Sequence, residues 1–167
     1  IDQLHHRARR GRARPHAQRT LNIAFVVQRY GAEILGGSEY HCRLIAERLS
    51  SRHQVEVLTT CARDYVTWAN EYSDGQDRIR GVTVRRFANA RTRDIKSFNA
   101  YSDWIFSNPH SADDEQEWLK QQGPWCPALI EHLEHPVQDD IDVRAVLKER
   151  SDHVVHTARD QAILLIR

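Results

Sequence analysis

The sequence predicts an α/β fold in which a parallel sheet is flanked by helices. Residues 23–27 form a continuous β-prone run, as expected of a strand buried on both faces of a parallel sheet. Residues 54–59 alternate polar and apolar side chains, which is typical of a second strand. Between them, a helix is predicted to follow residues 36–39 and to extend to about residue 52. Strand, helix and strand in this order favour a right-handed β-α-β crossover, the unit from which Rossmann-like domains are built.

The predicted helix carries an apolar stripe that we expect to face the sheet. Its members recur at helical spacing and are Tyr40, Leu44, Ile45 and Leu49. The next segment, residues 64–77, is predicted to be a polar loop. A third strand is expected over residues 82–87, where Val82, Val84 and Phe87 are apolar.

Helices are predicted to follow the third strand. Apolar residues with helical spacing predict the first of them, and they are Ile95, Phe98, Tyr101, Ile105 and Phe106. Ser111 and Asp114 form a capping-box pattern that opens a second helix, which Gly123 and Pro124 end after residue 122.

Two prolines bracket a further short helix, which opens at Pro127 and ends before Pro136. Beyond it, residues 141–150 are expected to be helical. Residues 153–156 and 162–166 are expected to be strands. The domain is therefore predicted to cover residues 21–167.

The composition is that of one soluble globular domain. The chain has 167 residues, of which 40% are hydrophobic and 28% are charged, and a net charge of +1. No apolar run approaches the roughly 20 residues that a membrane helix needs, and no signal peptide is recognisable. A cytoplasmic protein is the expectation. The absence of Met and the apolar run near the end predict that the chain is an incomplete piece of something longer.

Residues 1–20 form an Arg/His-rich arm that is expected to be disordered. The arm carries six arginines against one acid, Asp2. Such an arm binds phosphate without specificity. It contains no interleaved aromatic residues, so no specific nucleic-acid partner is expected.

The three cysteines, Cys42, Cys61 and Cys126, are far apart and form no CxxC pair. Reduced structural thiols are therefore expected, and a metal site is not.

Gly36, Gly37 and Ser38 lie between the first predicted strand and helix. This turn belongs to the carboxyl edge of the sheet, where α/β domains bind ligands. Glycine lets the backbone approach a ligand without a Cβ, and a helix N-terminus favours phosphate. The turn therefore predicts a site for a phosphorylated ligand. The alternative is a plain turn before a helix that Ser38 caps.

Two phosphate-binding motifs come close to this turn and fail. The phosphate-loop pattern is met by Gly31, Gly36 and Ser38, but Gly37 stands at the lysine position. Without that lysine nothing reaches the outer phosphates, which argues against an ATPase. The dinucleotide fingerprint G-x-G-x-x-G is absent because the two glycines are adjacent.

Four segments carry a resemblance to a known family, namely residues 21–31 (LNIAFVVQRYG), 36–39 (GGSE), 43–49 (RLIAERL) and 53–59 (HQVEVLT). In this order they resemble the N-terminal domain of retaining GT-B glycosyltransferases of the "group 1" type. Residues 81–84 (GVTV) fit the third strand of that family. The resemblance extends over residues 21–87, and residues 111–135 look similar to a subset of bacterial members.

The resemblance implies that the chain is one GT-B half, the half that binds the acceptor. The whole enzyme would transfer a sugar from a nucleotide-diphosphate sugar to a glycan or lipid-linked acceptor, without a metal or another cofactor. A lipid-linked acceptor would bring it to a membrane surface. In the family the glycine pair lies beside the donor diphosphate, a role that falls here to Gly36 and Gly37, with Ser38. The family's functional histidine after the fourth core strand loosely matches His156, for which an ordinary surface or core histidine is the alternative.

Aromatic residues of the predicted 64–77 loop are candidates for the acceptor site. Tyr65, Trp68 and Tyr72 could offer flat faces to a sugar, and buried packing of at least two of them is the alternative. Glu39 and Glu47 form an E-x7-E pair, a spacing with which some glycosyltransferases hold the donor sugar. Within the first helix, Glu47 is interpreted more simply as a solvent-facing acid near arginines.

The sequence departs from the family in lacking the second Rossmann-like domain, so the isolated chain is expected to be inactive. Residues 137–150 also do not resemble the aromatic-rich region expected there. One alternative is a non-catalytic binding module, either a degenerate Rossmann-like domain or a partner or nucleic-acid binder acting through the arm. Another is a different Rossmann-like enzyme that uses a phosphorylated small molecule.

Overall fold

The computed structural model describes residues 20–134 and 163–166. The predictions for the arm, for residues 141–150 and 153–156, and for His156 lie outside these residues. In chain order the described elements are β1 (Asn22–Val26), α1 (Gly37–Leu49), β2 (Gln54–Thr60), β3 (Gly75–Ile79), β4 (Val82–Phe87), α2 (Ile95–Ser107), α3 (Ala112–Gln122), α4 (Pro127–Glu134) and β5 (Ile163–Ile166).

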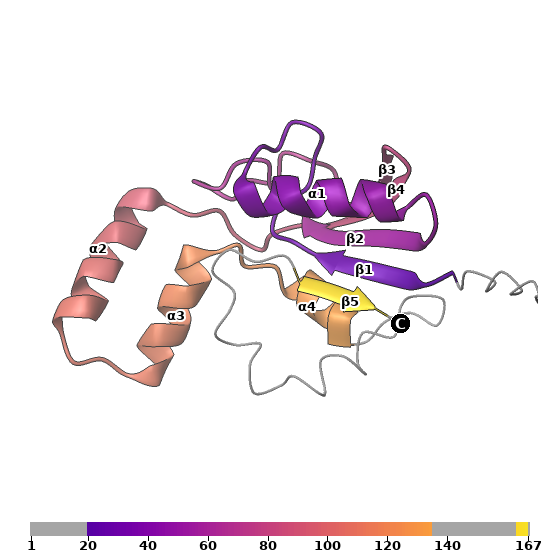
Figure 1. Ribbon diagram of the computed structural model, residues 1–167. Coiled ribbons are helices and arrows are strands. Elements are labelled where there is room, and N and C mark those ends of the chain that lie inside the picture. Colours follow the sequence, from indigo (N-terminus) through magenta and orange to yellow (C-terminus); the bar gives the residue numbers. More distant parts are fainter. Residues whose placement is uncertain (1–19, 135–162, 167) are drawn as a thin grey trace, which may run out of the picture.

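The strands form one mixed sheet in the order β3-β4-β2-β1-β5 (Figure 1). β1 and β2 are parallel, and β2 and β4 are parallel, so the predicted β-α-β unit and its third strand are confirmed. Both outer strands are antiparallel to their neighbours, β3 to β4 and β5 to β1. The expectation of an all-parallel sheet was therefore wrong at both edges.

β3 was expected to be part of the polar loop. It forms a hairpin with β4, connected by Arg80 (φ 48°) and Gly81 (φ 89°). Two consecutive positive φ angles are typical of a type I′ hairpin turn, whose twist matches that of the strands it joins. Because four of the five β3 residues are exposed, the strand lacks the polar–apolar alternation by which sequence analysis recognises a half-buried strand.

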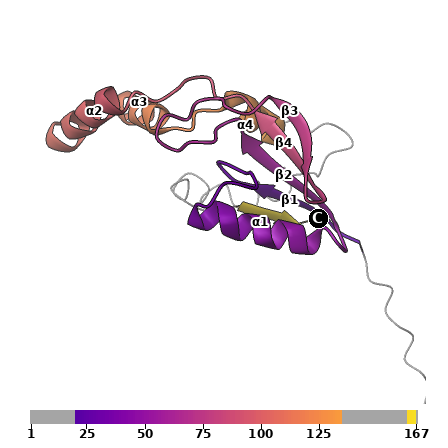
Figure 2. The same ribbon diagram turned by 90° about the horizontal axis from the view of Figure 1, so that it is seen from above.

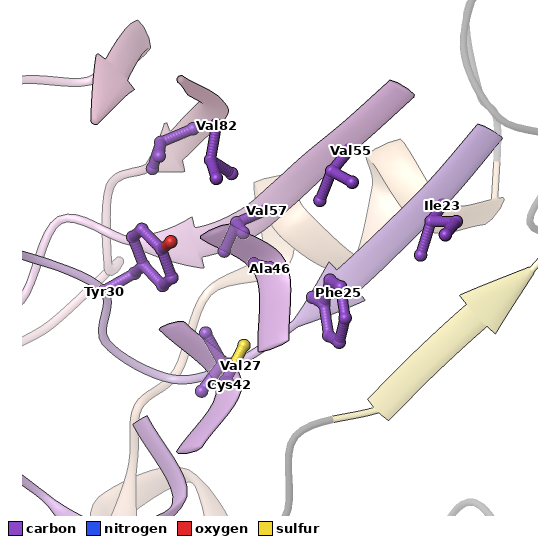
Figure 3. Packing of buried hydrophobic residues seen from close by; sticks show 10 residues of the cluster. Ile23, Phe25, Val27, Tyr30, Cys42, Ala46, Val55, Val57 and Val82 are labelled. Atoms are coloured by element: carbon purple, nitrogen blue, oxygen red, sulfur yellow. The ribbon is translucent and has the colours of Figure 1, made fainter. Parts of the chain in front are cut away.

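One core lies between the sheet and α1 (Figure 3). Its buried members are Ile23, Phe25, Val27, Tyr30, Cys42, Ala46, Val55, Val57, Val82 and Val84. On α1 the small Cys42 and Ala46 face the sheet, whereas Tyr40 is 43% exposed and Leu44 is 46% exposed. The predicted apolar stripe was therefore wrong for Tyr40 and Leu44. Small side chains at the contact let the helix pack closely on the strands.

A second core lies on the opposite face of the sheet, where α4 packs (Figure 2). Its members are Leu58, Cys126 and Leu129, with Val26, Phe87 and Leu133 packed against them. α1 and α4 thus cover opposite faces. The predicted helix after Pro127 is confirmed.

α2 and α3 form a hairpin that projects from the sheet (Figures 1 and 2). The predicted capping box at α3 is present, with Ser111 Oγ accepting from Asp114 N and the Asp114 carboxylate accepting from Ser111 N. Phe98 of α2 stacks on Trp118 of α3 with ring centroids 6.0 Å apart. Both predicted helices are confirmed.

The three cysteines are free and buried, as expected of structural thiols. Burial raises the pKa of Cys42 to about 12 and that of Cys61 to about 11. Among the described residues, no helix has the length and apolar character needed to cross a bilayer.

Candidate functional site

A hollow of about 560 Å³ opens at the carboxyl edge of the parallel strands. It is lined by Gln28, Arg29, Gly36, Gly37, Ser38, Glu39, Tyr65, Trp68, Arg93, Gln122 and Gly123. The structure therefore brings together five predicted site residues, which are Gly36, Gly37, Ser38, Tyr65 and Trp68, and Glu39 of the E-x7-E pair with them. Tyr72 is not among the lining residues, and His156 lies outside the described part of the chain.

The end of β1 is fixed by β2. Val27 N donates to Leu58 O at 3.1 Å, and Gln28 O accepts from both the amide (3.3 Å) and the hydroxyl (2.7 Å) of Thr60. These bonds continue the parallel pairing of β1 with β2 beyond the end of β1. Arg29, the next residue, then enters the hollow.

Two buried arginines hold the loop that precedes the glycine turn. Arg43 of α1 donates from Nη1 to Gly31 O (2.8 Å) and Ala32 O. Arg86 of β4 donates from Nη1 to Tyr30 O at 2.9 Å. Both side chains are nearly inaccessible, and each binds carbonyl oxygens of the loop through Nη1, so the two arginines hold the loop against the domain.

The two glycines of the turn differ in their surroundings. A Cβ on Gly36 would lie 2.9 Å from Glu39 Cδ and 3.0 Å from Arg29 Nη2, which is too close. A Cβ on Gly37 would meet nothing within 4 Å and would stand in the open hollow. A Cβ on Gly36 would thus force the Glu39 and Arg29 side chains to shift, whereas Gly37 leaves space beside the first turn of α1.

Ser38 does not cap α1. Gly36 is the N-cap residue and provides no side-chain cap. The Ser38 hydroxyl donates instead to Glu39 Oε2 at 3.0 Å. The alternative of a helix-opening turn capped by Ser38 was therefore wrong in its detail.

Glu39 and Arg29 form a buried ion pair inside the hollow. Arg29 Nε and Nη2 both donate to Glu39 Oε1, at 2.9 and 2.5 Å. Burial raises the pKa of Glu39, but hydrogen bonds from the main chain, Arg29 and Ser38 outweigh it and hold the pKa below its usual value. An ionised carboxylate of the protein thus occupies the first turn of α1, the position that attracts anions.

Glu47, the other member of the E-x7-E pair, is remote from this ion pair. It lies 3.7 Å from Arg43 Nε and 3.6 Å from Arg80 Nη1, and its side chain is 20% exposed. The interpretation as an acid near arginines is therefore confirmed for Arg43, but the side chain is half-buried and not solvent-facing. Glu47 connects α1 to the β3–β4 turn.

The three candidate aromatic residues have different environments. Tyr65 is 60% exposed, and the Arg29 guanidinium lies 5.2 Å from its ring centroid. Trp68 is buried and donates from Nε1 to Gln122 O at 2.9 Å. Tyr72 lies against the loop before the glycine turn, with its hydroxyl donating to Glu33 Oε1 at 2.6 Å. Only Tyr65 offers an open aromatic face to the hollow.

Arg93 closes the hollow on the side of the α2–α3 hairpin. Its guanidinium donates to Val66 O (2.7 Å), to Gln122 O (2.9 Å) and to Tyr65 O. It also lies 5.7 Å from the Trp68 ring centroid. Sequence reasoning missed Arg29, Glu39 and Arg93 as members of one site, because the contacts that join them cross loops and carry no sequence pattern.

The lining suits an anionic ligand with a flat or sugar-like part. Two guanidinium groups, of Arg29 and Arg93, and one carboxylate, of Glu39, line the hollow, and the N-terminus of α1 adds a partial positive charge. Tyr65 supplies an aromatic face beside them. Within residues 20–134 and 163–166 no cluster of three or more His, Cys, Asp or Glu side chains could hold a metal ion.

A smaller hollow of about 380 Å³ lies at the opposite, amino-terminal edge of the strands. Its lining includes His53, Glu56, Arg78 and Arg85. Its lining includes Gly81 of the β3–β4 turn but no residue at a helix N-terminus, so the carboxyl-edge hollow is the better candidate for a phosphorylated ligand.

Comparison with known proteins adds no relative to this picture. No protein-family model, no curated protein and no solved structure matches the chain. The functional conclusion therefore depends on the geometry and chemistry of the carboxyl-edge hollow.

Proposed function

We propose that the chain is the acceptor-binding half of a GT-B glycosyltransferase, which moves a sugar from a nucleotide-diphosphate sugar to a glycan or lipid-linked acceptor. The observation that supports this most is one hollow that combines the Gly36–Gly37 turn, the Arg29 guanidinium and the exposed ring of Tyr65. A phosphorylated sugar presents the matching groups, namely a diphosphate and a sugar ring.

In this proposal the donor diphosphate lies against the backbone of Gly36 and Gly37. The open space beside Gly37 is where the phosphate oxygens approach, because a Cβ there would meet no protein atom. Arg29 contributes a guanidinium, the group that binds phosphate oxygens in a fork geometry. Tyr65 provides a face for a sugar, while Trp68 supports the wall of the hollow through its bond to Gln122.

Tyr72 has a different place in the proposal. Its hydroxyl is bonded to Glu33, and its ring lies 4.2 Å from the Arg86 guanidinium. Through these contacts it braces the loop before the glycine turn. We therefore assign the acceptor face to Tyr65 and a supporting role to Tyr72.

Sugar transfer would require a second domain to close the other side of the donor. Transition-state charge is stabilised when preorganised groups enclose it and exclude water. The hollow of this chain is open, and a second α/β domain is what the resemblance implies for the missing side. The isolated chain should therefore bind the diphosphate weakly and transfer no sugar.

The experiment is a titration of the 167-residue chain with inorganic pyrophosphate and a panel of nucleoside diphosphates, followed by ¹⁵N NMR. Glycine amides resonate in a separate region of the spectrum. The Gly36 and Gly37 amides should shift with a Kd on the order of 1 mM, as expected of an open half-site. Arg29→Met should weaken binding about tenfold, a change of about 1.4 kcal/mol.

Arg78→Met is the matched control, because Arg78 is an exposed arginine that lines the opposite hollow. It should leave the titration unchanged. Shifts confined to glycines outside the turn, or an Arg29→Met variant that binds as well as the parent, would overturn the proposal. Binding by the turn without sugar transfer, even after a second domain is restored, would favour the alternative of a non-catalytic binding module.

A further inference from the structure

The α2–α3 hairpin exposes apolar side chains on a surface that nothing in the described chain covers. They are Ile95 (41% exposed), Trp104 (42%), Phe106 (72%) and Leu119 (54%). The hairpin projects from the sheet in both views of the molecule (Figures 1 and 2). Exposed large apolar side chains mark candidate interaction surfaces, and we name these four residues of α2 and α3 the hairpin surface.

The segment that carries the hairpin surface is strongly acidic. Residues 94–122 contain two lysines, Lys96 and Lys120, and six acids, which are Asp94, Asp103, Asp113, Asp114, Glu115 and Glu117. The formal charge of this segment is therefore −4. Such a charge repels the anionic surface of a membrane and the phosphates of a nucleic acid. A cationic protein surface with apolar groups is the partner that fits.

The outward face of α1 has these properties. Tyr40 and Leu44 are exposed, and Arg48 continues their stripe at the next i+4 position. Arg52 follows just beyond the helix and is also exposed. We name these four residues the α1 outer face. Residues 20–93 as a whole carry eleven arginines against eight acids, a formal charge of +3.

We infer that a second copy of this chain is the partner, and that the hairpin surface of one copy docks on the α1 outer face of the other. Each set of residues includes exposed apolar side chains and the two are opposite in charge, which favours their encounter and its orientation. Within one molecule the hairpin extends beyond the end of the sheet and does not lie over α1 (Figure 2). The two surfaces can therefore meet only between copies.

A two-fold arrangement satisfies both surfaces of both copies. Each hairpin then contacts the α1 of its partner, and the assembly closes as a dimer with two identical contacts. The exposure of Tyr40 and Leu44, which is unusual for an apolar helix stripe, is explained because the second copy covers them.

The test is sedimentation equilibrium of the full 167-residue chain at low salt and at about 0.5 M salt, over a wide protein concentration range. The expected result is a dimer at low salt whose dissociation constant rises at least tenfold at high salt. At high salt the Debye screening length falls to a few ångströms, which weakens the attraction between the oppositely charged surfaces. A chain that remains monomeric at low salt and several hundred micromolar protein would overturn the inference.

Three variants locate the contact. Phe106→Ser in the hairpin surface and Leu44→Ser in the α1 outer face should each weaken dimerisation at least tenfold. Ile130→Ser is the matched control, since Ile130 of α4 is 45% exposed, close to the 46% of Leu44, and belongs to neither surface. Circular dichroism checks that all three remain folded. A dimer that responds to Ile130→Ser and not to the other two would overturn the proposed faces.

Mixing the two variants gives a further test. In a two-fold dimer, a Phe106→Ser copy paired with a Leu44→Ser copy keeps one undamaged contact. The mixture should therefore associate more strongly than either variant alone. Association no stronger than that of the separate variants would contradict the reciprocal contact between hairpin surface and α1 outer face.

Discussion

Replacing Glu39 by Gln should change stability and ligand affinity in opposite directions. Glu39 lies at the first turn of α1, paired with Arg29 and 7% exposed. It therefore competes with any anionic ligand for the same guanidinium and the same helix end. The substitution keeps the shape of the side chain and removes its charge.

The stability cost comes from the charged hydrogen bonds. Arg29 donates to the Glu39 carboxylate from two nitrogens, and hydrogen bonds to charged groups contribute about 2 kcal/mol each when a partner is lost. An amide recovers part of this, so we expect a loss of about 2 kcal/mol in the free energy of unfolding. For a domain of this size the Tm should fall by roughly 6–10 °C.

The gain in affinity comes from removing a repulsive charge. A carboxylate about 5 Å from a phosphate charge opposes it by about 3 kcal/mol at an effective dielectric constant of about 20. Solvent screening reduces this, so a tenfold tighter Kd for pyrophosphate, about 1.4 kcal/mol, is the expected outcome. Isothermal titration and thermal unfolding of the same preparation measure both quantities.

The matched control is Glu117→Gln. Glu117 forms an ion pair of similar length with Arg91, 3.0 Å, and lies on α3 away from the lining of the hollow. Its loss should leave pyrophosphate affinity unchanged. If Glu39→Gln lowers the Tm while its pyrophosphate affinity stays the same or falls, the anion does not compete with Glu39 and the assignment of the phosphate position is wrong.

Three further predictions concern residues that line the carboxyl-edge hollow. Gly36→Ala should destabilise the fold by about 2 kcal/mol because its Cβ crowds Glu39, whereas Gly37→Ala should be near neutral in thermal unfolding and should weaken pyrophosphate binding. Equal Tm values for the two variants would refute the distinction. Gly123→Ala should cost about 2–4 kcal/mol in urea unfolding, since Gly123 has φ 65° and its Cβ would lie 2.6 Å from the Trp68 ring. Finally, the depressed pKa of Glu39 means that its stabilisation is complete above the usual value of 4.5 and is lost as pH falls through the lower, folded-state pKa. Glu39→Gln should therefore unfold less steeply in acid than the parent, and parallel acid transitions would contradict this.

The elements with strong local signals were predictable from the sequence. The β-prone run of β1 and the capping box of Ser111 and Asp114 depend on neighbouring residues, so a single sequence contains their cause. β3 was missed because it is a polar edge strand that exists only through pairing with β4. The Arg80–Gly81 pair was its one local signal, since a residue followed by glycine suits a two-residue hairpin turn.

The candidate site was only partly predictable. The Gly36–Gly37 turn follows from its position between strand and helix, which sequence order reveals. Arg29 and Glu39 are ten residues apart in the sequence, so their pairing depends on the conformation of the loop between them. The burial of Arg43 is likewise a tertiary effect, because the carbonyls that it binds come from that same loop. Periodicity alone therefore placed Ile45 and Leu49 of α1 correctly against the core but was wrong for Tyr40 and Leu44.

Arg93 gives the molecule a mechanical connection between its two proposed binding regions. One guanidinium holds the Tyr65–Val66 backbone at the hollow and the Gln122 carbonyl at the end of α3. A shift of the hairpin must therefore either carry the wall of the hollow with it or break these bonds. If occupancy of the hollow favours one hairpin position, thermodynamic reciprocity requires that contacts on the hairpin change ligand affinity by the same factor. Lysine at this position would keep the charge but could not span three carbonyls with a rigid planar group, so Arg93→Lys would weaken the connection between the two regions.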